Sequence, residues 1–137
     1  MITSYSANRV VDYNFGGTAY SGGLPATYYV GLSTSTINFD GTGATEPTGI
    51  GSYARVAFTN NKTNFGTSSN GILTNAVAVN FAESSASWGT VTHVGLWDAL
   101  TAGNIWWFDA LSPSRAVASL TTVIFSVGAI TVTFNNV

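Results

Sequence analysis

Apolar and polar residues alternate along much of this chain with a period of two, which is typical of β-strands that have one buried face. The clearest run is 26–33, in which every second residue from Ala26 to Leu32 is apolar or aromatic. The alternation recurs at six further places, which are residues 54–58, 77–81, 94–96, 106–108, 123–127 and 130–134. The pattern therefore predicts at least seven short strands.

Helical spacing occurs in one segment, near the amino terminus. Between residues 6 and 15, the apolar side chains of Val10, Val11 and Phe15 fall near helical spacing, and a glycine pair follows at 16–17. A glycine just after the last periodic residue is a common helix end. We therefore expect a short N-terminal helix.

Many short strands joined by glycine-rich turns predict an all-β fold. We expect one domain over residues 1–137, a β-sandwich of jelly-roll type, with the short helix at its start. The side chains expected to be mostly buried are the apolar members of the alternation: Tyr28, Val30, Val56, Phe58, Val79, Leu96, Trp106, Phe125, Val132 and Phe134.

The segments 91–98 and 104–110 suit a hairpin that has apolar side chains on both faces. One face would carry Val94, Leu96, Trp106 and Phe108, and the other would carry Trp97, Ile105 and Trp107. One sheet face of a solitary domain normally meets water, so a second apolar face needs a cover. That cover is the protein's own long loop, another subunit, or a sugar stacked on the tryptophans.

The segment 33–52 is about as long as loops without secondary structure become in compact domains, and such loops often serve binding or assembly. We interpret its Asp40 and Glu46 as turn residues rather than calcium ligands, because the dense acids of an EF-hand loop are missing. Arg55, in the next strand, could place its planar guanidinium on a carboxylate or an aromatic ring. Alternatively, it is an exposed charge that discourages edge pairing.

Charged residues are scarce. Four basic and six acidic residues give a net charge of −2, and 7% of the chain is charged against about 25% in a typical soluble domain. Too few basic residues are present to neutralise a row of phosphates, so nucleic acid is not an expected partner. No apolar run approaches the about 18 residues of a membrane-spanning helix. The lack of cysteine excludes disulfides and thiolate metal sites.

Acid–base chemistry would have to use the single histidine, His93. If Asp98 pairs with Asn104 in the hairpin, the register places His93 opposite Asp109, Gly95 opposite Trp107 and Trp97 opposite Ile105. A His–Asp pair could belong to a catalytic triad, but the chain has no G-x-S-x-G nucleophile elbow. We interpret the pair as a cross-strand polar contact and expect neither an enzyme nor a cofactor.

Several motifs, taken in order, point to a known family. They are FGGTAYSGGLPATYYVGLST, TEPTGIGSYARVAFT, SWGTVTHVGLWDALTAGNI and the closing GAITVTF, and together they span nearly the whole chain. This order resembles a family of small virion proteins of tailed bacteriophages. A glycine pair is common in the family where this chain has Gly51-Ser52.

The resemblance implies a structural virion protein. Proteins of this kind are described as capsid decoration (cement) proteins or as tail-fibre proteins, and we expect the first: a protein on the outer capsid surface that binds the major capsid protein and other copies of itself. The alternative is a tail-associated fibre or a module that binds host glycans. The expected subunit interface comprises Phe39, Asp40, Glu46, Arg55, Trp97, Ile105 and Trp107.

Overall fold

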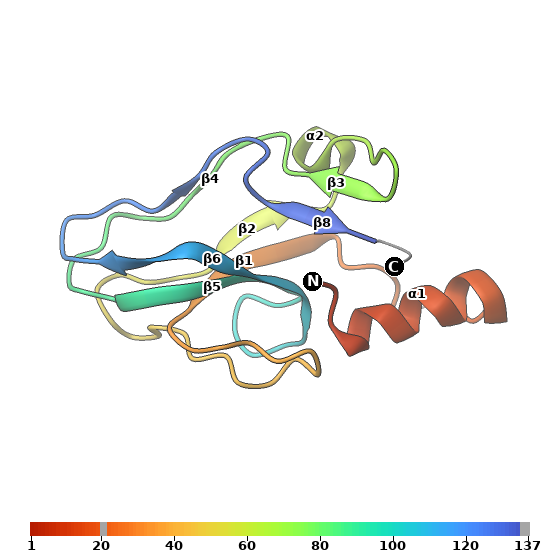
Figure 1. The fold of residues 1–137 in the computed structure, drawn as a ribbon, viewed down its shortest axis with the longest axis horizontal. Coiled ribbons are helices and arrows are strands. Elements are labelled where there is room, and N and C mark those ends of the chain that lie inside the picture. Colours follow the sequence, from red (N-terminus) through yellow and green to blue (C-terminus); the bar gives the residue numbers. More distant parts are fainter. Residues whose placement is uncertain (20–21, 135–137) are drawn as a thin grey trace.

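A computed structural model describes residues 1–19 and 22–134 (Figure 1). Two residues of the FGGTAYSGG segment, Tyr20 and Ser21, and the last three residues of the expected domain lie outside the described part. The elements, in chain order, are α1 (Ser4–Gly16), β1 (Thr27–Ser33), β2 (Val56–Thr59), α2 (Lys62–Phe65), β3 (Ile72–Thr74), β4 (Val79–Asn80), β5 (Gly89–Trp97), β6 (Ile105–Val117), β7 (Ile124–Phe125) and β8 (Thr131–Thr133).

The centre of the fold is an antiparallel sheet of four strands in the order β2-β1-β5-β6. In its middle pair, Val30 faces Leu96 and Leu32 faces Val94. These four side chains are at most 3% exposed. The alternation in the sequence therefore places one apolar row on the same side of both central strands.

Two ribbons, β3-β8 and β4-β7, lie over one face of this sheet (Figure 1). The main core lies on this face. Its buried members are Val30, Leu32, Phe58, Phe65, Val79, Phe81, Trp88, Val91, Val94, Leu96, Trp107, Val117 and Ile130.

The opposite face of the sheet has an apolar cluster of its own. It comprises the buried side chains of Ile37, Trp97, Ile105 and Phe108, against which Tyr29 and Ala44 also pack. Ile37 and Ala44 belong to the 33–52 loop. Of the three covers considered for the second face, the protein's own loop is therefore the one that packs there.

The all-β class is confirmed, and each of the seven expected runs contains a strand. The short elements β3 and α2 were not expected; α2 begins after Asn61, whose side chain accepts a hydrogen bond from the Asn64 amide. The arrangement of one four-stranded sheet and two two-stranded ribbons does not confirm a jelly roll.

The expected core is correct for most of its members. Val30, Phe58, Val79, Leu96 and Trp106 are buried. Tyr28, Val56, Phe125 and Val132 are partly buried and pack against the main core.

Phe134 is the exception, with 56% of its surface exposed. The strand β8 ends at Thr133, so Phe134 lies just beyond the ribbon that would have covered it. The alternating pattern shows which residues can share a face, but it does not show where the pairing stops.

The helix α1 is longer than expected, and both ends are capped. The Thr3 hydroxyl accepts a hydrogen bond from the Ser6 amide at the start, and Gly17 adopts φ 64° at the end. The hydroxyl groups of Thr3 and Ser6 donate to the carbonyl groups of Ile105 and Trp106, at 2.5 and 2.6 Å. The first turn of α1 is thus fixed to the start of β6.

Candidate functional site

The β5–β6 hairpin contains a β-bulge that decides which tryptophan faces which side. Trp97 pairs with Ile105 as expected, but Leu96 pairs with Trp107, so Trp106 is an extra residue on β6. An extra residue shifts the side-chain alternation on one strand by one position. The expected pairing of Gly95 with Trp107 is therefore wrong, and Gly95 faces Phe108.

The shift separates Trp107 from the other residues of the expected outer face. Trp107 is 3% exposed and belongs to the main core, whereas Trp97 and Ile105, 3% and 5% exposed, belong to the cluster beneath the loop. The expectation that all three share one face of the hairpin is wrong. All three side chains are buried within this chain, so none of them is accessible to another subunit in this structure.

The same shift separates His93 from Asp109. His93 pairs with Ala110, and Asp109 pairs with Val94. The His93 Nδ1 atom instead lies 2.9 Å from the hydroxyl oxygen of the adjacent Thr92. The expected His–Asp pairing is wrong, and with it the geometric basis for a triad.

A pair of glycines makes room for the Trp97 ring on the sheet. Gly31 of β1 and Gly95 of β5 face each other, and the Trp97 ring lies over both. A Cβ atom at Gly31 would come within 2.8 Å of that ring, and one at Gly95 within 2.7 Å. Only residues without a side chain leave space for an indole that lies this close to the backbone.

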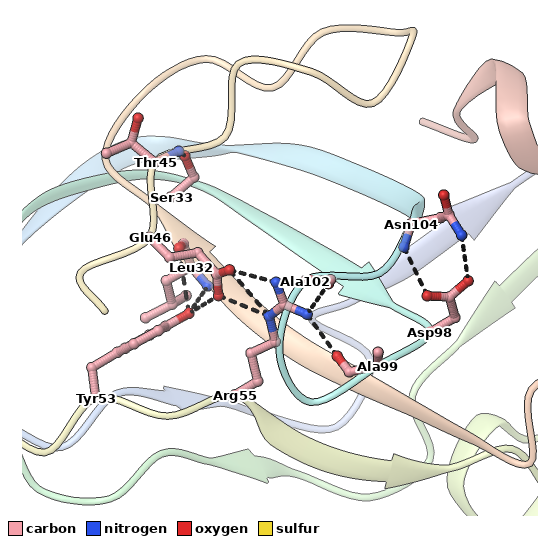
Figure 2. A network of polar contacts seen from close by, with 10 residues as sticks. All are labelled: Leu32, Ser33, Thr45, Glu46, Tyr53, Arg55, Asp98, Ala99, Ala102 and Asn104. Atoms are coloured by element: carbon pink, nitrogen blue, oxygen red, sulfur yellow. Dashed lines mark hydrogen bonds and ion pairs between the residues drawn. The ribbon is translucent and has the colours of Figure 1, made fainter. Parts of the chain in front are cut away.

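Arg55 packs over the Trp97 ring, and Figure 2 shows its contacts with Glu46, Ala99 and Ala102. Its guanidinium carbon lies 4.3 Å from the centre of the Trp97 ring. Its Nε and Nη2 atoms donate to the Glu46 carboxylate, with the closest distance 2.6 Å, and its Nη1 atom donates to the carbonyl groups of Ala99 and Ala102. The guanidinium therefore joins the 33–52 loop to the 98–104 turn.

Tyr53 completes the network around Glu46. Its hydroxyl donates to the Glu46 carboxylate at 2.7 Å and accepts a hydrogen bond from the Leu32 amide at 2.8 Å. Burial raises the pKa of the Tyr53 hydroxyl well above its usual range. Tyr53 is therefore a neutral donor at every physiological pH, which suits the support of a carboxylate rather than proton transfer.

Asp98 organises the turn between β5 and β6. Its carboxylate accepts hydrogen bonds from the backbone and side-chain amides of Asn104, at 2.7 and 3.0 Å, and from Nε1 of Trp106 at 3.2 Å. Partial burial raises the pKa of this carboxyl, but the hydrogen bonds outweigh that effect and the pKa of Asp98 lies below its ordinary value.

The tip of the loop holds the two expected interface residues that remain exposed. Phe39 is 54% exposed, and Asp40 is exposed beside it. The Asp40 carboxylate accepts hydrogen bonds from the hydroxyl and amide of Thr42, which lower its pKa. The Phe39 carbonyl accepts a hydrogen bond from the Ser4 amide. The loop is therefore a folded cover and not a free arm.

The sequence did not reveal a groove that lies between α1, the sheet and the β3-β8 ribbon. It has a volume of about 500 Å³. Its lining is largely apolar and includes Val10 of α1, Leu96 and Trp106 of the sheet, and Leu73 of β3, with Lys62 among its polar members. Residues of seven separate stretches of the chain line it, so no short sequence motif could have predicted it.

Within residues 1–19 and 22–134, no group of three or more His, Cys, Asp or Glu residues is placed to hold a metal ion. No helix in this part of the chain is long and apolar enough to cross a membrane. The chemistry that the described residues present is a set of hydrogen bonds and apolar contacts that fix loops to a sheet.

Comparison with known proteins gives one finding. A family model described as podophage GP4 fiber I protein gp80 matches residues 1–133, which is nearly the full length. No curated protein matches the chain.

Proposed function

The chain belongs to the family of the podophage GP4 fiber I protein gp80, and from that premise we propose that it is a structural subunit of a phage fibre. Membership of this family makes it a structural protein of a phage virion. The fibre assignment follows from the description of that family as a podophage fiber I protein. The observation that carries the proposal is the exposed apolar surface on α1 and beside the groove.

Apolar surface remains exposed around the N-terminal helix and the groove. Val11 and Phe15 of α1 are 50% and 88% exposed, and Leu24, which lines the groove, is 56% exposed. Large exposed apolar side chains on a helix, together with an apolar groove, are typical of a surface that binds another protein. With few charges available, attachment by this surface would rest on apolar burial.

Capsid decoration is the second candidate. It would place the chain on the outer capsid surface, bound to the major capsid protein, and the observation in its favour is the exposed Phe39 at the tip of the loop. The rings of Trp97 and Trp107, which we expected to carry such an attachment, are buried within the chain. The fibre assignment therefore ranks first.

We propose neither catalysis nor glycan binding. His93 and Asp109 are not opposite each other. Asn60 and Asn61 lie beside the groove, as they would in a sugar site, but the Trp106 ring there is only 8% exposed and presents little face for a sugar to stack on. The groove fits an apolar protein segment better.

The location in the particle tests the proposal directly. Antibodies against the purified chain, applied to intact phage and viewed by electron microscopy, should label fibres at the tail, in a few tens of copies or fewer per particle. Labelling over the head shell in hundreds of copies would replace the fibre assignment with capsid decoration.

A further inference from the structure

The second half of α1 has almost no cover. Every residue from 11 to 16 is exposed, and the helix extends beyond the sheet in Figure 1. Val11 and Phe15 are one helical turn apart on the same side of the helix, and Ala7 precedes them by a further turn. Helices in proteins gain most of their stability from packing of an apolar face. Ala7, Val11 and Phe15 form an apolar stripe, and its two larger side chains, Val11 and Phe15, are exposed to solvent.

The groove described above has the complementary chemistry. It offers about 500 Å³ of open, largely apolar space. The exposed Lys62, the single lysine of the chain, is part of its lining. The exposed half of α1 carries one charge next to the stripe, the carboxylate of Asp12. The same chain therefore carries an apolar helix stripe beside an acidic residue, Asp12, and an apolar groove beside a basic residue, Lys62.

We propose that the exposed half of α1 binds in the groove of a second copy of this chain, with Phe15 in the apolar part and Asp12 facing Lys62. The proposal rests on the proposed function, because it names the contact through which the fibre subunits associate. Phe15 is 88% exposed in its own chain, so its burial would need a second molecule.

The contact is self-complementary, because every copy carries both the exposed helix half and the groove that would bind it. If two copies exchange helices, both grooves are filled and the assembly closes with two-fold symmetry. A buried Phe contributes about 150–250 Å², so two copies of Phe15 supply a substantial part of the about 1,200–2,000 Å² of a specific interface. The low charge of the chain leaves apolar burial as the main source of affinity.

Sedimentation equilibrium of the purified full-length chain tests the proposal. The parent should have a mass of at least two chains, and Phe15→Asp should raise the dissociation constant by about thirtyfold, the factor that corresponds to a hot-spot loss of about 2 kcal/mol. Phe15 is too exposed for this change to unfold the monomer. Phe39→Asp is the matched control, because Phe39 is exposed but lies outside the groove, and it should associate like the parent.

A charge exchange identifies the groove as the receiving surface. Asp12→Lys and Lys62→Asp should each weaken association, and the double variant should recover part of the loss, because the opposite charges meet again across the interface. Association unaffected by Phe15→Asp, or without recovery in the double variant, would overturn this contact.

The absence of cysteine allows a further check. A chain with Phe15→Cys and a separately tagged chain with Leu73→Cys, once mixed and oxidised, should form a mixed disulfide in preference to the Phe15→Cys homodimer. The reverse preference would show helix-to-helix pairing and overturn the groove contact.

A monomeric parent would also overturn it, and the groove would then be assigned to another virion protein. These measurements use purified protein, whereas the fibre assignment is tested on whole particles, so the two can fail separately.

Discussion

The guanidinium of Arg55 lies 4.3 Å from the centre of the Trp97 ring while it binds Glu46 through two of its nitrogen atoms. One side chain thus joins three segments: the 33–52 loop, the residues just before β2 and the 98–104 turn. Both roles that the sequence allowed for Arg55, a carboxylate partner and an aromatic partner, occur together. The alternative role of an exposed edge charge is wrong, because Arg55 is only 9% exposed.

Removal of Arg55 should destabilise the fold. Arg55→Ala leaves Glu46, whose side chain is 15% exposed, without its cation, and loss of one partner of a buried ion pair costs about 3–5 kcal/mol. Arg55→Lys should recover only part of this, because an ammonium group cannot hold Glu46 and two carbonyl groups in the same plane. Urea unfolding measures both variants. Arg115→Ala, an exposed arginine on β6, is the control and should change little.

The glycine pair beneath Trp97 leads to a second prediction. A Cβ atom at Gly95 would lie 2.7 and 2.9 Å from two atoms of the Trp97 ring, so Gly95→Ala must displace the indole and should cost about 1–3 kcal/mol of unfolding free energy. Tryptophan fluorescence should change with it. The same substitution at Gly16, where the nearest atom is 3.7 Å away, should be neutral or stabilising. Equal effects at both sites would contradict the close approach.

The sequence predicted every strand except β3, because apolar residues recur with a period of two in the others. It could not predict the side on which Trp107 lies, because one extra residue, Trp106, reverses the alternation within β6. A bulge leaves no sign in the apolar pattern when all residues around it are apolar. The helix α1 was predictable from its spacing and from the glycines that end it.

The site was predictable only in part. Glu46 and Arg55 were singled out by their residue types, and the structure brings them together. Their shared position over Trp97 depends on how the 33–52 loop folds back on the sheet, which is a long-range contact that no local pattern encodes. The groove beside α1 was even less predictable, because it depends on how α1 and the β3-β8 ribbon pack against the sheet.

Asp98 should make the stability depend on pH in acid. An aspartate in the unfolded chain has a pKa of about 3.9, and hydrogen bonds hold the pKa of Asp98 in the folded chain below its ordinary value. The ionised carboxylate therefore adds stability above about pH 4, and this contribution is lost as the pH falls through the folded pKa. Asp98→Asn should lower stability at pH 7 and flatten the dependence below about pH 4.

Unfolding free energies of the parent and Asp98→Asn, measured between about pH 2 and 7, test this expectation. Glu83→Gln provides an exposed acid as control. Parallel curves for the parent and Asp98→Asn would show that Asp98 is not a source of the acid sensitivity.

His93→Ala should leave the assembly of particles close to normal. The ring nitrogen of His93 contacts the neighbouring Thr92 and lies away from Asp109 in the register, so its loss removes a local contact and no reactive pair. Particle yield and infectivity of a phage with this change are the measurements. Hydrolytic activity of the purified parent that disappears in His93→Ala would refute the absence of catalysis.

Trp107 and Phe39 separate stability from attachment. Truncation of a buried Trp costs about 3–5 kcal/mol, and Trp107 is 3% exposed, so Trp107→Ala should lower incorporation into particles because less of the chain is folded. Phe39→Ala should unfold at the parent's urea concentration, because this ring is 54% exposed. Any loss of incorporation in that variant would therefore report a direct contact of the loop tip.

The chain has few charges to form ion pairs, so incorporation of the parent should change little between low and moderate salt. A collapse of incorporation at moderate salt would show that ion pairs, and not apolar contacts, hold the subunit in the particle.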